Sequence, residues 1–247
     1  MSALILALAA GAVIGLALGA LGGGGSVLAV PALIYLLGFT PIAATTAGLV
    51  IVAVTSATAL PAHARDGHVR WRTGLLFAAA GIGPAVLGGA LASRLSESAL
   101  TCAFAAVAAV AAVRMLRPGR TPATGPVRPL RAAGAGAGLG AVTGVLGVGG
   151  GFLAVPALVG VLGLAMREAV GTSLLVISVN STAALAMRAG TADGLDWAVI
   201  GPFAAAAVLG AWDGKRLAAR VSGGALQRIF ALVLLAVAAV MLIDVAV

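Results

Sequence analysis

The chain has 247 residues, of which 62% are apolar and only 9% charged, and its mean hydropathy is +1.17. An ordinary soluble domain has roughly 25% charged residues, so this composition excludes a soluble globular protein and indicates a polytopic membrane protein. The net charge of +8 comes almost entirely from arginines in short connections between long apolar runs, with hardly any interleaved aromatic residues. That distribution is a signal of membrane orientation and argues against a nucleic-acid partner.

The first apolar region, residues 3–38, is longer than one membrane span and is interrupted by GGGGSVLAVPAL at 22–33. Glycine and proline both weaken a helix interior. The region therefore divides into a helix of ordinary length and one of about 12 residues, too short to cross a bilayer alone. This pattern predicts a re-entrant hairpin. The N-terminus lacks the basic segment of a cleaved signal peptide, so we expect it to be part of the mature fold.

Six later runs have the apolarity of transmembrane helices, which need about 20 apolar residues, two of them only with their flanks included. They are Ile42 to Ala62, Thr73 to Ala92, Ala99 to Val113, Ala169 to Met187, Trp197 to Ala211 and Leu226 to Ile243. A second interrupted region, residues 132–163, contains GVGGGFLAVPAL at 147–158 and predicts a second hairpin of the same kind. We therefore expect an all-α polytopic membrane protein.

The chain is an internal duplication. Residues 11–38 align with residues 136–163 at an offset of 125 with 16 identities in 28 positions. Between the copies lies RPGRTPATGPVRPLR, residues 117–131, whose proline and arginine content is typical of a cytoplasmic linker. The expected units are residues 1–116, this linker, and residues 132–247. Each repeat is a glycine-broken hairpin followed by three transmembrane helices.

Charge predicts that the two repeats are inverted. A hairpin that enters and leaves on one face gives each repeat three crossings, an odd number, so the second copy has the opposite orientation. With the linker in the cytoplasm, the basic connections at 63–72 and 213–228 also fall there, as the positive-inside rule requires. Four crossings per repeat would give parallel copies and put the second of these connections outside, so we favour inversion.

We interpret both glycine clusters as hairpin tips that approach the middle of the membrane from opposite faces. Non-helical backbone survives at that depth only inside protein or along a watery cavity. The short helix after each tip begins with N–H groups that bind anions, and glycine lets a ligand approach the backbone closely. The clusters lack the lysine of a P-loop. The Gly-x-x-x-Gly spacings elsewhere in the chain instead indicate close helix packing.

Polar residues within the apolar runs supply further candidates. A lone Ser or Thr usually bonds its own helix backbone, but the amide of Asn180 needs a partner in apolar surroundings and is the best single candidate outside the glycines. The candidate substrate-binding residues are Gly23, Gly24, Gly25, Ser26, Thr45, Thr46, Gly149, Gly150, Gly151, Thr172, Ser173, Asn180 and Ser181.

The spans have no Asp, Glu, Lys or His in their middle. The sequence therefore offers no obvious proton relay and no base to activate a serine nucleophile, so an enzyme is not expected. The single cysteine, Cys102, allows no internal disulfide and no CxxC metal site, and we expect neither a metal nor a cofactor. The histidine-containing segment 63–68 is expected in a solvated cytoplasmic loop, and Arg167 and Glu168 are expected to mark the membrane interface.

The chain resembles the TauE/SafE family, the sulfite exporter group. The resemblance rests on GVGGGFLAVPAL at 147–158, its copy at 22–33, AVGTSL at 169–174, and Asn180 with Ser181 in LLVISVNSTAAL, and it covers nearly the whole chain. It implies transport of sulfite or an organosulfonate across the bacterial inner membrane, commonly outward.

The first copy departs from the family pattern, since TAGL at 46–49 replaces GTSL and Ser26 stands where the second copy has Gly151. The two tips are therefore expected to contact the substrate unequally. We expect a secondary transporter for small sulfur-containing anions, surrounded by membrane lipid, that works by alternating access around the tips. A passive anion channel and a transporter of a non-sulfur organic anion remain open alternatives, and so does a homodimer.

Overall fold

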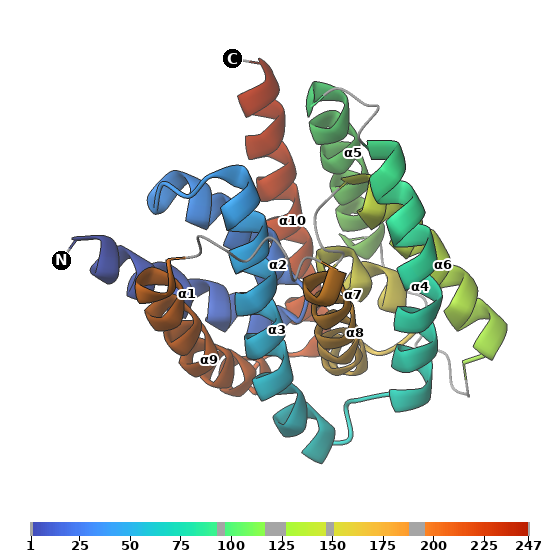
Figure 1. Ribbon diagram of the computed structural model, residues 1–247. Helices are drawn as coiled ribbons and strands as arrows, with labels where there is room; N and C mark the ends of the chain where they lie inside the picture. Colours follow the sequence, from blue (N-terminus) through green and yellow to red (C-terminus); the bar gives the residue numbers. More distant parts are fainter. Residues whose placement is uncertain (1, 93–96, 117–126, 147–150, 188–195, 247) are drawn as a thin grey trace.

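The computed structural model describes residues 2–92, 97–116, 127–146, 151–187 and 196–246, and all regular structure in those ranges is helical. The first half forms α1 (Ser2–Leu21), α2 (Gly24–Pro31), the π-helical η1 (Ala32–Leu36), α3 (Pro41–Arg65), α4 (Trp71–Ala92) and α5 (Glu97–Leu116). The second half forms α6 (Pro129–Leu146), α7 (Gly151–Gly160), α8 (Met166–Met187), α9 (Trp197–Ala219) and α10 (Gly223–Ala246). The predicted all-α class is confirmed (Figure 1).

Six helices in the described part of the chain are long and apolar enough to cross a membrane. These stretches are Leu4–Leu21, Ile42–Arg65, Ala99–Leu116, Met166–Met187, Trp197–Ala219 and Gly223–Ile243. The last five coincide with expected spans, and the first is the longer arm of the first expected hairpin. The run at Thr73 to Ala92 also forms a helix, α4, of 22 residues. The chain is therefore a multi-pass membrane protein.

The first glycine cluster separates a long helix from a short one, as predicted. Gly22 follows α1 with a positive φ of 71°, and α2, of 8 residues, begins at Gly24. Pro31 lies at the end of α2 and lacks the N–H that would continue the hydrogen-bond ladder. Beyond Pro31 the chain continues as the π-helical η1. In the second copy α7 has 10 residues, and residues 147–150 lie outside those described.

Both repeats leave their short helices by the same turn. Gly38 and Gly163, which are 125 residues apart, have φ of 70° and 72°. In each case the glycine N–H donates to the carbonyl four residues earlier, and the next N–H donates to the carbonyl six residues earlier. Glycine is favoured at this position because its φ is positive. The backbone thus repeats at the same offset as the sequence.

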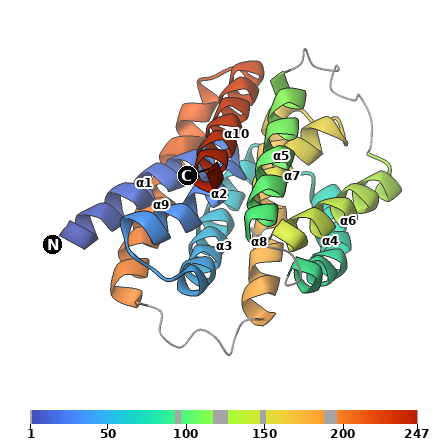
Figure 2. The ribbon, with the colours of Figure 1, turned by 90° about the horizontal axis from the view of Figure 1, so that it is seen from above.

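The two halves exchange helices. The most extensive helix contacts join α1 to α9 and α6 to α4, and the offset of 125 maps one of these pairs onto the other. Seen from above in Figure 2, α1 and α2 lie with α9 and α10, while α4 and α5 lie with α6 and α7. The helices α3 and α8 contact each other between these two groups. Neither half is therefore a separate bundle.

Small residues allow these exchanged pairs to approach closely. A Cβ added at Gly15 of α1 would lie 2.6 Å from the Cα of Ala207, and one at Gly140 of α6 would lie 2.7 Å from the Cα of Gly81. These positions are again 125 residues apart. The expectation that the Gly-x-x-x-Gly spacings pack helices together is confirmed.

The helices α3 and α8 are antiparallel. Ser178 Oγ, in the second half of α8, donates to Ser56 Oγ, in the second half of α3, at 3.0 Å. The N–H of Arg70, beyond the end of α3, donates to Thr172 Oγ1 near the start of α8 at 3.0 Å. Residue numbers therefore rise along α3 as they fall along α8.

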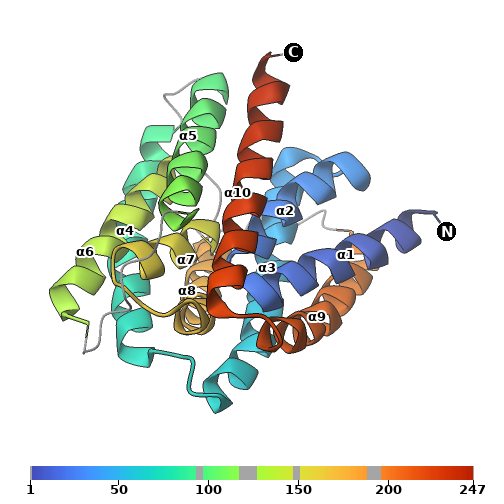
Figure 3. The ribbon, with the colours of Figure 1, turned by 180° about the vertical axis from the view of Figure 1, so that it is seen from behind.

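The helices α5 and α10 are antiparallel as well. Gln227, near the start of α10, donates from Nε2 to the carbonyl of Met115, near the end of α5, at 2.6 Å. Figure 3 shows the two helices next to each other from behind. Like α3 and α8, they are related to each other by the offset of 125.

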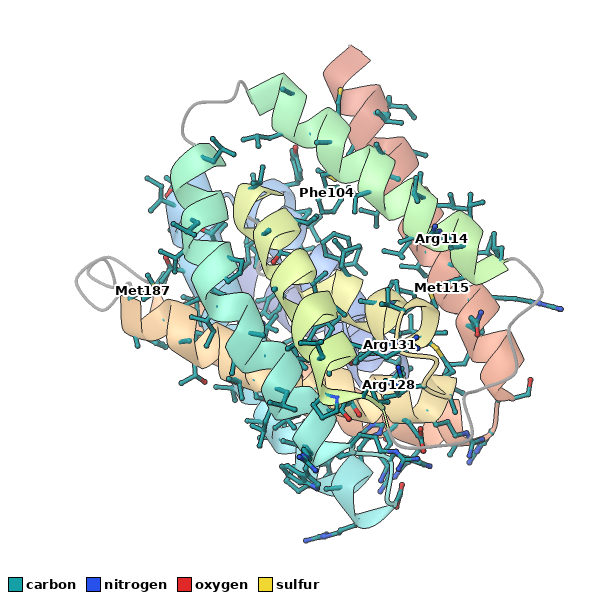
Figure 4. All side chains as sticks on the ribbon, turned by 90° about the vertical axis from the view of Figure 1, so that its right-hand side faces the viewer. Phe104, Arg114, Met115, Arg128, Arg131 and Met187 are labelled. Atoms are coloured by element: carbon teal, nitrogen blue, oxygen red, sulfur yellow. The ribbon has the colours of Figure 1, made fainter. Side chains whose placement is uncertain are left out.

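All lysines and arginines of the described ranges lie at one end of the bundle. This end joins the ends of α3, α5 and α9 to the starts of α4, α6, α8 and α10. Figure 4 shows the nitrogen atoms gathered along the lower and right-hand sides of the molecule, with Arg114, Arg128 and Arg131 there and Met187 at the opposite side. It is the end that the sequence assigns to the cytoplasm.

Candidate functional site

The glycine tip of the first repeat touches the start of the short helix of the second. A Cβ added at Gly23 would lie 2.6 Å from the carbonyl carbon of Gly151 and 2.9 Å from the Cα of Phe152. Gly151 and Phe152 are buried, and only a residue without a Cβ allows so close an approach. The structure therefore brings together two of the predicted clusters.

Ser173 of α8 lies at the same junction. A Cβ added at Gly22 would touch Ser173 Oγ and lie 3.2 Å from the Cα of Val170. Ser173 is fully buried, and its hydroxyl donates to the carbonyl of Val170 at 2.8 Å. Its oxygen retains lone pairs that face the tip, so a polar group from a second-repeat helix adjoins the first-repeat glycines.

The first turn of α2 consists of the next predicted residues, Gly24, Gly25 and Ser26. Its N-cap residue, Gly23, has no side chain to cap the helix. The N–H groups of a first helical turn have no partner within the helix, and together they carry the positive end of the helix dipole. An anion is favoured at this position. The predicted residues Gly149 and Gly150 lie outside the described residues.

Three predicted threonines have partners within the protein. Thr45 and Thr46, at the start of α3, both donate to the carbonyl of Ile42, at 2.9 and 3.1 Å. Thr172 is fully buried and accepts the N–H of Arg70 at 3.0 Å. It thereby fixes the α3–α4 connection against α8, a contact that the sequence did not suggest.

A second polar group lies further along α8, two helical turns or about 10 Å beyond Ser173. Asn180 Oδ1 is buried without a hydrogen-bond donor among the described residues, and Ser181 is buried next to it. Ser178 of the same helix donates to Ser56 of α3 at 3.0 Å. Sequence reasoning missed Ser178, because nothing distinguishes such a serine from one that bonds only its own backbone.

The amide of Asn180 is suited to a polar ligand. Leaving a buried acceptor without a donor costs about 1–3 kcal/mol. A carboxamide presents an oxygen acceptor and, after a half-turn about χ2, a two-proton donor. Asn180 is therefore able to accept from the hydroxyl of a protonated oxyanion or to donate to a bare oxygen. Ser173, which adjoins the first glycine tip, and Asn180 both lie on α8 but do not contact each other.

A separate pocket of about 90 Å³ lies at the basic end, where α1, α3 and α9 end and α8 and α10 begin. Its charged and polar lining residues are His63, Asp66, His68, Arg167 and Lys215. The expectation of a solvated loop is wrong for His63, which lies in the last turn of α3 and is only 5% exposed. The reason is the exchanged packing, because α1 and α9 cover this turn of α3.

Two ion pairs lie beside this pocket. Lys215 Nζ contacts Asp66 Oδ2 at 2.8 Å, and its hydrogen bond holds the pKa of the Asp66 carboxyl below the usual value. Glu168, the neighbour of Arg167, contacts the guanidinium of Arg70 at 2.6 Å. Among the described residues, no three His, Cys, Asp or Glu side chains are arranged to hold a metal ion.

Comparison with known proteins identifies two kinds of similarity. The chain matches the family model described as "Sulfite exporter TauE/SafE" over residues 7–241. Two proteins of Xylella fastidiosa, from strains Temecula1 / ATCC 700964 and 9a5c, are each named "Probable membrane transporter protein" and are 34% and 35% identical to the chain over 244 residues. The matches cover 95% of this chain and 93% of each relative.

Proposed function

Because the chain belongs to the sulfite exporter TauE/SafE family of membrane transporters, we propose that it is a secondary transporter that exports small sulfur-containing oxyanions, sulfite or an organosulfonate, across the bacterial inner membrane. The observation that carries the proposal is the meeting of Gly23 with Gly151. It joins two glycine breaks that ordinary helix packing does not require, at the start of α2, whose N-cap residue Gly23 has no side chain.

The helix arrangement supports inverted repeats. The offset of 125 maps α3 onto α8 and α5 onto α10, and both pairs are antiparallel. A two-fold axis that relates antiparallel helices runs perpendicular to them. Since these four helices are candidate spans, the axis would lie in the membrane plane. The contact of Gly23 with Gly151 joins the two repeats, and inversion would put the substrate near the midplane, as in other inverted-repeat transporters.

We assign the oxyanion to N–H groups at the tips, assisted by hydroxyls and the Asn180 amide. The full proposed set is Gly23, Gly24, Gly25, Ser26, Thr45, Thr46, Gly149, Gly150, Gly151, Thr172, Ser173, Asn180 and Ser181. Donors without a fixed cation bind an anion less tightly than charged groups do, and weak binding suits release. Alternating access would then expose the tip junction to one face at a time.

Transport assays with reconstituted protein test this function. Proteoliposomes containing the purified chain are supplied with labelled sulfite, sulfoacetate, sulfate, thiosulfate or acetate. The proposal requires saturable uptake with a preference for a sulfur oxyanion, together with counterflow when the vesicles are preloaded with the same anion. Flux without saturation or counterflow would indicate a passive channel, and a preference for acetate would indicate a non-sulfur organic anion.

A further inference from the structure

The pocket at the basic end carries more positive charge than its neighbours neutralise. Arg167 and Lys215 both line it, and Asp66 is the one carboxylate among its described lining residues. Asp66 is paired with Lys215. Arg167 takes part in none of the ion pairs between described residues. Within the described ranges it donates only to the carbonyls of Ala219 and Val221, both at 3.3 Å. The described residues therefore leave one cationic charge beside the pocket uncompensated.

His63 supplies the second observation. Its side chain lines the pocket, yet both ring nitrogens are buried and neither forms a hydrogen bond with a described residue. The backbone of Gly19 approaches the ring without completing a hydrogen bond. The groups that face the ring are Lys215, His68 and Asp66, and the centroids of the two imidazoles are 6.5 Å apart. A buried polar group normally has a hydrogen-bond partner, so a partner for the His63 imidazole is missing from the described part of the pocket.

We propose that this pocket binds one small oxyanion group, of the sulfonate or phosphate type, with Arg167 and Lys215 supplying charge and His63 and His68 supplying N–H donors. An imidazole offers at least one N–H in either protonation state, and a guanidinium binds the oxygens of such groups well. The volume of about 90 Å³ is enough for a small anion, since a water molecule occupies roughly 30 Å³ in the liquid.

The pocket adjoins the proposed transport site. Val170 lines the pocket, and its Cα also lies 3.2 Å from the position of a Cβ on Gly22. One residue of α8 thus separates the pocket from the first glycine tip. The pocket is placed to collect anions on the cytoplasmic side before they reach the tips. This role rests on the proposed function, whereas the binding itself does not.

The two histidines allow a test on the unmutated chain, because the sequence contains no others. The tag-free protein in neutral detergent is treated with diethyl pyrocarbonate, and modification of His68, the half-buried histidine of the pair, is followed by peptide mass spectrometry. We expect sodium sulfate or phosphate to slow the modification several-fold relative to sodium chloride of equal ionic strength. Equal rates in all three salts, with no effect of anionic lipid either, would overturn the proposal.

A matched pair of variants identifies the cation involved. Arg167→Gln should abolish the protection. Arg216→Gln removes the same charge one residue after Lys215, but Arg216 is 76% exposed and pairs with Asp213 outside the pocket, so it should retain the protection. Wild-type protection in Arg167→Gln would overturn the proposal. Thermal unfolding of both variants checks that they are folded.

A further comparison identifies the source of the anion. Short-chain phosphatidylglycerol is tested against phosphatidylcholine of the same chain length. Protection by sulfate or phosphate assigns the pocket to a free anion, whereas protection by phosphatidylglycerol alone assigns it to a lipid headgroup. Asn180→Leu separates the two sites, because it should reduce transport at least tenfold and leave the protection intact. Normal transport in that variant would remove Asn180 from the proposed substrate site without affecting the pocket.

Discussion

At Asn180 a buried amide oxygen lacks a donor in the described part of the chain. Such a group lowers stability by about 1–3 kcal/mol, so the fold alone does not explain it. We expect Asn180→Leu to leave the melting temperature unchanged or raise it, because leucine has a similar size and no polar atom to satisfy. Transport of the preferred oxyanion should fall at least tenfold. Melting curves in detergent and uptake into proteoliposomes measure the two effects.

Thr182→Val is the matched control on the same helix. Thr182 is exposed and donates only to the carbonyl of Ser178, so valine should change neither stability nor transport appreciably. If Asn180→Leu transported normally, or if it lost stability, the amide would be part of the fold rather than of the substrate site.

Gly23 provides a residue-scale test of the tip junction. We expect Gly23→Ala to lower the free energy of unfolding by about 1–3 kcal/mol, because its Cβ would meet the backbone of Gly151 rather than a movable side chain. Transport should fall with it. Gly201→Ala is the control, since no atom lies within 4 Å of that Cβ and alanine favours a helix by roughly 0.5–1 kcal/mol over glycine. Equal stability of both variants would mean that the tips do not meet.

At the scale of elements, the exchanged pairs α1·α9 and α6·α4 should contribute equally to stability. Gly15 and Gly140 are related by the offset of 125, and a Cβ at either would lie 2.6 or 2.7 Å from a Cα of the facing helix. We expect Gly15→Ala and Gly140→Ala each to cost about 1–3 kcal/mol, measured by reversible unfolding in detergent. Gly138→Ala, on the open side of α6, should be neutral or stabilising. A cost confined to one of the two pairs would contradict their equivalence.

The same elements show what could be read from the sequence. The helix breaks at the glycine clusters and the Gly-x-x-x-Gly contacts follow from local backbone chemistry, and both were predictable. The exchange of helices between repeats was not, because hydropathy does not specify which helices pack together. Burial of His63 and the Ser178–Ser56 hydrogen bond depend on that exchange. The tip–tip contact was anticipated only in outline, since the charge pattern orders the connections along the membrane normal but gives no lateral distances.

At the scale of the whole molecule, inversion of the repeats would distribute equivalent turns to opposite faces of the membrane. Leu36 and Val161 are 125 residues apart, are 52% and 57% exposed, and lie next to the matching turns at Gly38 and Gly163. Inverted repeats put Leu36 at the outer face and Val161 at the cytoplasmic face, whereas parallel repeats would put both on one side.

Single cysteines at these positions decide between the two arrangements. In a Cys102→Ala background, which removes the one native thiol, we expect Leu36→Cys to react with a membrane-impermeant maleimide added to intact cells. Val161→Cys should react only in inside-out vesicles, because the basic connections hold its turn in the cytoplasm. Labelling of both from the same side would make the repeats parallel. The two-fold axis would then run along the membrane normal, and the tips could no longer approach the substrate from opposite faces.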